Sequence, residues 1–124
     1  MPQTVVVDTS AILSVFEEKV NLESQLADLL GSVSIVIPSA ARDELSALGT
    51  AASKAAGALC TRYGTYNCSR RGDEGVIEAA LELHAYAAVT NDAELADRMV
   101  KLGVRVIRLM GRKRFAFYRS DEVQ

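Results

Sequence analysis

The stretch VVVDTSAIL at residues 5–13 places a carboxylate, Asp8, directly after three β-branched residues typical of a buried strand. Moving an ionised group out of water costs on the order of several kcal/mol. An aspartate at the edge of an apolar core therefore needs a partner. The fold of this chain has to supply that partner from another part of the sequence.

The composition is that of one globular domain covering residues 1–124. The chain is 49% hydrophobic and 24% charged, which is enough to build a real core. No apolar stretch is long enough to span a bilayer, and the first ten residues lack the pattern of a secretory signal. We therefore expect a cytoplasmic protein with no membrane association.

The charges are segregated along the sequence, although the net charge is only −2. Residues 1–50 hold seven acidic and two basic residues, whereas residues 98–119 hold eight basic residues and no acidic one. This asymmetry favours an anionic partner for one face, most simply a nucleic-acid backbone. A solvated surface that balances the acids elsewhere is an equal alternative on this observation alone.

Short runs rich in valine and isoleucine alternate with longer segments of helical spacing. Strands are predicted at residues 4–8, 32–38, 87–91 and 104–109, with a short strand possible at 65–69 and a last strand or ribbon at 111–120. Helices are predicted at residues 11–16, 21–30, 38–48, 50–64, 72–85 and 93–102. This order favours an α/β fold in which helices cover both faces of a mostly parallel sheet. Active sites in such sheets lie beyond the carboxyl ends of the strands.

Helical periodicity separates the acids expected to face inward from those expected to face solvent. A rotation of about 100° per residue places Glu44 on the apolar side of its helix and gives Asp73 the stripe of Val76 and Ile77. Asp92 follows a strand, as Asp8 does. Each of the last two acids also has a simpler explanation: Asp92 as a helix N-cap, and Asp73 as an acid in a first helical turn. The opposite stripe of the helix at residues 72–85 is expected to be solvated and consists of Glu74, Glu78 and Glu82.

The inward acids can all meet at one edge of a parallel sheet; they are Asp8, Glu44, Asp73 and Asp92. Two like charges about 4 Å apart repel by about 4 kcal/mol at an effective dielectric near 20, so such a cluster shares protons or holds cations. Oxygen ligands without histidine or cysteine favour Mg²⁺ or Mn²⁺. The remaining candidate ligands are expected to be packed in the core: His84, on an apolar helix stripe, and the cysteines Cys60 and Cys68.

Four motifs in this order resemble those of the PIN-domain nucleases: VVVDTSAIL with Asp8, ARDEL with Glu44, GDEGVIEAA with Asp73 and VTNDAELADR with Asp92. The segment TNDAELADRMVKLGVRVIRLMGRKRFAF resembles the branch that processes small-subunit ribosomal RNA, with its archaeal relatives. It is less similar to the VapC toxins, which usually lack this basic tail. The resemblance implies a three-layer α/β/α fold and a ribonuclease site whose catalytic metal ligands are these four carboxylates, supported by Ser10 and Asn91.

The activity implied by this resemblance is hydrolysis of RNA phosphodiesters with Mg²⁺ or Mn²⁺, in ribosomal RNA processing. One metal would lower the pKa of a bound water, and a second would stabilise the leaving oxygen. Contacts to the RNA backbone are expected from Arg108, Arg112, Lys113, Arg114 and Arg119. The neighbouring aromatic residues Phe115, Phe117 and Tyr118 fit a core position better than base stacking.

Other functions remain open on the sequence alone. A VapC-type toxin and a non-cleaving PIN module that binds RNA or assembly partners would carry the same motifs, and a homodimer is compatible with the family. An aspartyl-phosphate phosphatase also places an aspartate after its first strand. That enzyme requires a second aspartate two residues later, where this chain has Ser10.

Overall fold

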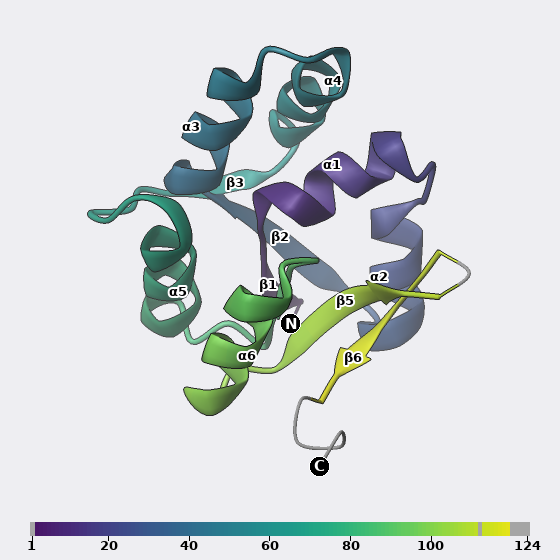
Figure 1. Ribbon diagram of the computed structural model, residues 1–124. Coiled ribbons are helices and arrows are strands. Elements are labelled where there is room, and N and C mark those ends of the chain that lie inside the picture. The colour runs from purple at the N-terminus through teal and green to yellow at the C-terminus, as the bar shows by residue number, and fades with distance from the viewer. Residues whose placement is uncertain (1, 112, 120–124) are drawn as a thin grey trace.

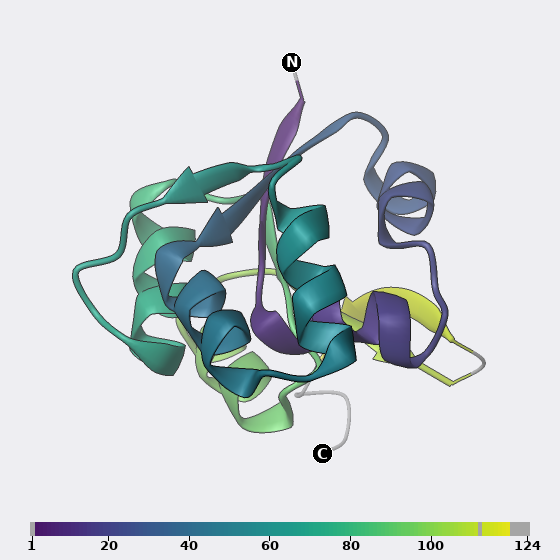
Figure 2. The same cartoon turned by 90° about the horizontal axis from the view of Figure 1, so that it is seen from above.

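The computed structural model describes residues 2–111 and 113–119, in which two layers of helices enclose a twisted sheet (Figure 1, Figure 2). The strands are β1 (Gln3–Val7), β2 (Val33–Pro38), β3 (Gly64–Tyr66), β4 (Ala87–Val89), β5 (Val106–Met110) and β6 (Arg114–Tyr118). The helices are α1 (Thr9–Glu17), α2 (Leu22–Leu30), α3 (Ser39–Leu48), α4 (Ala51–Cys60), α5 (Gly72–Glu82) and α6 (Ala93–Lys101). The predicted α/β class and layer order are confirmed.

The sheet reverses its winding direction between β1 and β4. Its strand order is β3-β2-β1-β4-β5-β6, with β1 to β5 parallel and β6 antiparallel to β5. Val7 pairs with Val89, and the Asp8 amide donates to the Val89 carbonyl at 2.9 Å. The chain therefore leaves β1 and β4 side by side at the switch point, where ligands bind in open α/β sheets.

Alternate residues of β1 pack into two separate hydrophobic cores, one on each face of the sheet. Val5 and Val7 of β1 face the layer formed by α1, α2, α3 and α4, whereas Val6 faces α5 and α6. All three valines are fully buried. Burial on both faces explains why β1 is a continuous β-branched run and does not alternate with polar residues.

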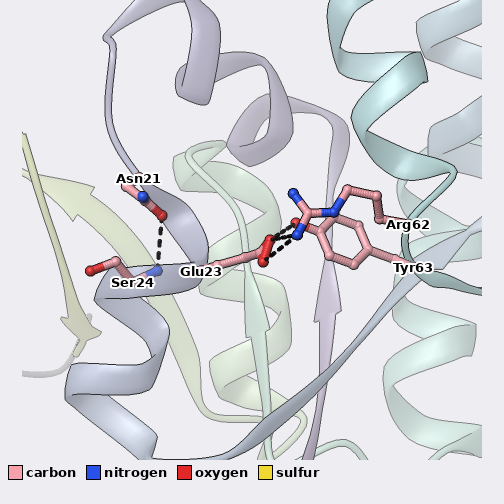
Figure 3. A network of polar contacts seen from close by, with 5 residues as sticks. All are labelled: Asn21, Glu23, Ser24, Arg62 and Tyr63. Atoms are coloured by element: carbon pink, nitrogen blue, oxygen red, sulfur yellow. Dashed lines mark hydrogen bonds and ion pairs between the residues drawn. The ribbon is translucent and has the colours of Figure 1, made fainter.

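Helix α2 is fastened to the end of α4 by polar contacts (Figure 3). Its N-cap is Asn21, whose side chain accepts a hydrogen bond from the Ser24 amide at 2.9 Å. The Glu23 carboxylate accepts from the Tyr63 hydroxyl at 2.8 Å and pairs with Arg62 at 3.2 Å. Glu23 is thus a structural acid on the α2 and α4 side of the molecule.

Several element boundaries differ from the prediction. Helix α5 ends at Glu82, so the prediction that His84 lies in the core is wrong. His84 is exposed and has a φ of 48°, and the following amide of Ala85 donates to the Ala80 carbonyl to close the helix. Helix α4 ends at Cys60, and β3 begins at Gly64, earlier than the predicted strand at 65–69.

The side chains predicted to pack are buried to different degrees. Cys60 and Phe115 are buried, whereas Cys68 is partly exposed and Phe117 is 38% exposed. In the described part of the chain, no helix has the length and hydropathy needed to cross a membrane.

Helices α3 and α5 approach each other at Gly75, where a side chain has no room. A Cβ atom at this position would lie 2.6 Å from the Ala40 Cβ and 2.6 Å from the Arg70 carbonyl oxygen. Because one of these atoms belongs to the backbone, it cannot move aside cheaply. The contact fixes α5 and the chain before it against α3.

We therefore predict that Gly75→Ala destabilises the protein by about 1–3 kcal/mol through overpacking. Gly57→Ala is the matched control, because Gly57 lies within α4 and a Cβ atom there would meet nothing within 4 Å. The control should be neutral or up to about 1 kcal/mol more stable. Urea denaturation of both variants measures the difference, and equal midpoints would refute the close contact.

Candidate active site

The carboxylate of Asp8 sits at the carboxyl end of β1, held by two hydroxyl groups. The Thr90 hydroxyl donates to Asp8 Oδ2 at 2.8 Å, and the Ser10 hydroxyl donates to the same oxygen at 3.2 Å. Asp8 is only 7% exposed, and Thr90 is fully buried. These hydrogen bonds orient the buried carboxylate and partly offset its loss of hydration.

The loop that carries Asp92 is built onto the same hydroxyls. The Asp92 amide donates to the Thr90 hydroxyl at 3.1 Å, and the Asn91 amide donates to the Ser10 hydroxyl at 2.9 Å. Asp92 also caps α6, because its Oδ1 accepts from the Leu95 amide at 3.1 Å. The simpler explanation of Asp92 as an N-cap is therefore confirmed, and its carboxylate is also placed next to the end of β1.

The four predicted carboxylates influence one another electrostatically. Burial raises the pKa of Asp8, and the charge of Glu44 raises it further against the opposing hydrogen bonds. Burial likewise raises the pKa of Asp73, followed by the charges of Asp92 and Asp8, while Arg98 acts in the opposite direction. The charges therefore act in pairs, Glu44 on Asp8 and both Asp92 and Asp8 on Asp73.

Glu44 lies on a different face of α3 from the one predicted. The prediction that it lies on the buried side of α3 is wrong: Glu44 is exposed, and Leu45 is buried in its place. Helix α3 buries Ala41 and Leu45, and Arg42, expected on the outer face, donates to the Cys60 carbonyl at 3.0 Å. Glu44 instead opens into a hollow of about 300 Å³ lined by Ala40, Asp43, Glu44, Arg71 and Gly72.

The donor set at this edge fits a hard divalent cation in its chemistry. All four groups are carboxylates, and their mutual repulsion is relieved when a cation lies between them. In the described residues, no three histidine, cysteine, aspartate or glutamate side chains are close enough to hold a metal ion together. The four carboxylates therefore do not converge on one point, although Glu44 affects the pKa of Asp8, and Asp92 and Asp8 affect that of Asp73.

Arg108, predicted to contact RNA, is engaged inside the protein. Its Nη2 donates to the Asn91 carbonyl at 2.9 Å, and its guanidinium lies 5.1 Å from the centre of the Tyr118 ring. The Asn91 side chain accepts from the Leu109 amide at 2.8 Å. Arg108 and Asn91 therefore hold the loop before Asp92 against β5, which is a positioning role.

The other predicted RNA contacts fall on two different edges of the sheet. Lys113 lies in the turn between β5 and β6, and Arg114 begins β6 opposite Met110, the last residue of β5; both are exposed. Arg119 lines a hollow of about 560 Å³ with Tyr86 and Arg105, at the amino ends of the parallel strands. Arg112 lies outside the described residues.

Sequence reasoning missed two residues that organise this edge. The Thr90 hydroxyl forms hydrogen bonds with both the Asp8 carboxylate and the Asp92 amide. Its place in the sequence could have indicated this role, because Thr90 directly follows β4 as Asp8 directly follows β1. Glu78 was expected to be solvated, but it accepts hydrogen bonds from Ser69, Arg70 and Tyr66 and holds the loop before α5. No periodicity could reveal that contact, because it joins a helix to an irregular loop.

We predict that Thr90→Val lowers the free energy of unfolding by about 1–3 kcal/mol, because it removes a buried hydroxyl partner from both Asp8 and the Asp92 amide. Thr90→Ser keeps the hydroxyl and should cost less. Chemical denaturation at neutral pH compares the two variants. A valine variant as stable as the serine variant would contradict the role assigned to the hydroxyl.

Comparison with known sequences gives one family match. Residues 5–112 match the family described as "PIN like domain", which covers most of the chain and all four acids. No curated protein matches the sequence.

Several solved structures share the fold. The PIN domain endonuclease Utp24 superposes with a TM-score of 0.80 at 21% identity, over 95% of this chain and 92% of that one. A PilT N-terminus domain protein from the hyperthermophilic archaeon Sulfolobus solfataricus P2 gives 0.55 at 18% identity, over 85% and 86%. The catalytic core of Rad2 in complex with DNA substrate gives 0.53 at 15% identity, over 98% of this chain but 48% of that core.

Proposed function

The chain belongs to the PIN-like domain family, and on that premise we propose that it is a divalent-metal-dependent endoribonuclease. The proposed active site is the carboxyl edge of the sheet around Asp8. The observation that carries this proposal is the buried carboxylate of Asp8 at the carboxyl end of β1, which the Thr90 and Ser10 hydroxyls hold beside the loop of Asp92. The charge of Glu44 acts on Asp8, and the charges of Asp92 and Asp8 act on Asp73, which supports including all four acids in the proposed site.

The residues proposed to hold Mg²⁺ or Mn²⁺ are Asp8, Glu44, Asp73 and Asp92. When bound, the cation supplies positive charge that neutralises the scissile phosphate and lowers the pKa of water. Thr90 and Ser10 fix the orientation of the Asp8 carboxylate, which a buried ligand needs before any ion arrives. Asn91, held by Arg108, sets the position of the backbone that carries Asp92.

The proposed substrate is RNA, and the proposed role is ribosomal RNA processing. This rests on the sequence resemblance to that branch of PIN nucleases and on the basic residues Lys113 and Arg114, at the carboxyl end of β5. The fold also superposes on the PIN domain endonuclease Utp24, and this likeness supports the nuclease part of the proposal.

We predict that Asp8→Asn reduces RNA cleavage to background, because it removes a negative ligand while leaving a side chain of the same size. Glu82→Gln is the matched control, since this exposed acid lies on α5 away from the stripe of Asp73. The assay is denaturing electrophoresis of structured ribosomal RNA fragments with Mg²⁺ or Mn²⁺. Cleavage by the Asp8 variant at the wild-type rate would refute the assignment.

We also predict that Mn²⁺ or Mg²⁺ raises the midpoint of thermal unfolding, because a ligand that binds only the folded state stabilises it. At 100 times the dissociation constant, the stabilisation is about 2.7 kcal/mol. Asp73→Asn should lose most of this shift, whereas Glu82→Gln should keep it. An equal shift with KCl of matched ionic strength would show general screening and would contradict a specific site.

A further inference from the structure

The loop between β3 and α5, residues 67–71, is exposed yet firmly held. The Glu78 carboxylate accepts hydrogen bonds from the Ser69 amide at 3.0 Å, the Ser69 hydroxyl at 2.9 Å and the Arg70 amide at 3.0 Å. These contacts lower the pKa of Glu78, so the carboxylate stays ionised at neutral pH. The Cys68 amide donates to the Ser39 hydroxyl at 2.8 Å, which ties the loop to the start of α3.

Two adjacent arginines, Arg70 and Arg71, are displayed by this loop and are exposed. Among residues 2–111 and 113–119, ion pairs join Arg62 to Glu23 and Arg98 to Glu74, and neither loop arginine takes part in one. Arg71 lines the same hollow as Glu44, although the two charges are not within ion-pair distance. A rigid backbone thus places two like charges together, beside the site and without a described carboxylate partner.

The position of this loop along the sheet edge suits contact between the two arginines and a polyanion that crosses the edge. It follows β3, at one end of the edge that carries Asp8, whereas the hairpin with Lys113 lies at the other end (Figure 1). The two ends are separated by about five strand spacings, roughly 24 Å. A polyanion crossing this edge meets repulsion from the central carboxylates, so it requires positive charge on both sides of them.

We propose that Arg70 and Arg71 bind the phosphate backbone of a single RNA strand on the Glu44 side of the carboxylate edge. This inference rests on the proposed function, because it takes the edge as the cleavage site. The arginines act as binding residues through charge and paired N–H donors, which match phosphate geometry. Glu78 acts through the loop backbone and is a positioning residue.

The test is the salt dependence of RNA binding in the Asp8→Asn background, which prevents cleavage. Fluorescence anisotropy of a labelled single-stranded RNA of about 12 nucleotides is measured between about 25 and 200 mM KCl. Each phosphate contact contributes about 0.7 to the slope of log affinity against log salt for a single strand. We expect Arg70→Ala with Arg71→Ala to lower the slope by about 1.4 and to weaken binding at least about tenfold at low salt.

The matched control is Lys54→Ala with Lys101→Ala, which removes the same two charges from exposed positions on α4 and α6. It should leave the slope unchanged, and replacing both arginines by lysine should restore most of it. The inference is overturned if the arginine and control variants have equal slopes, or if the parent protein does not bind RNA.

Cleavage by the chain with Asp8 intact is measured separately, so that the two proposals can fail independently. If RNA is cut and the double arginine variant binds and cuts as the wild type does, only the arginine assignment fails. If binding depends on the arginines but no RNA is cut, the phosphate contact stands and the proposed nuclease activity fails.

Discussion

Burial of the Asp8 carboxylate at the carboxyl edge of the sheet is the constraint on which the arrangement of the proposed site depends. The strand order reverses between β1 and β4, so Asp8 and the loop carrying Asp92 leave the sheet side by side. Helix α5 adds Asp73 to the same field, and both Asp8 and Asp73 have raised pKa values. A buried carboxylate with a raised pKa weakens the fold, and the proposed cation would offset part of that cost.

The chain uses its acids in two distinct ways. Glu23, Glu78 and Asp97 each accept a hydrogen bond from a tyrosine, which fixes the frame around the site. Asp8 and Asp73 instead have environments that disfavour their own charge. A satisfied acid lowers the free energy of the fold, whereas an acid with a raised pKa costs stability, which makes Asp8 and Asp73 the candidates for the proposed site. Two further side chains hold the β4–α6 loop in place: Thr90 donates to the Asp8 carboxylate, and Arg108 donates to the Asn91 carbonyl.

The sequence predicted the layers of helices and sheet, but it did not predict the exposure of Glu44 and His84. The run before Asp8 showed where the sheet edge lies, because β-branched runs are typical of parallel strands buried on both faces, and the short apolar strand before Asp92 ends at the same edge. Periodicity failed for Glu44 and His84. Arg42 donates to the Cys60 carbonyl at the end of α4, Leu45 takes the buried position on α3, and α5 stops before His84. Both errors come from tertiary contacts and helix termination, which local spacing does not encode. The predicted roles of the four acids and of the basic hairpin remain predictions.

The central claim is that the negative field at this edge exists to hold a divalent cation. Anomalous scattering from a crystal of the protein grown with Mn²⁺ tests it most directly, because the signal locates the ion without reference to any assay. The account predicts a strong peak against the Asp8 carboxylate, bounded by at least one of Asp73 and Asp92. A peak elsewhere on the molecule, or no peak at saturating Mn²⁺, would contradict it.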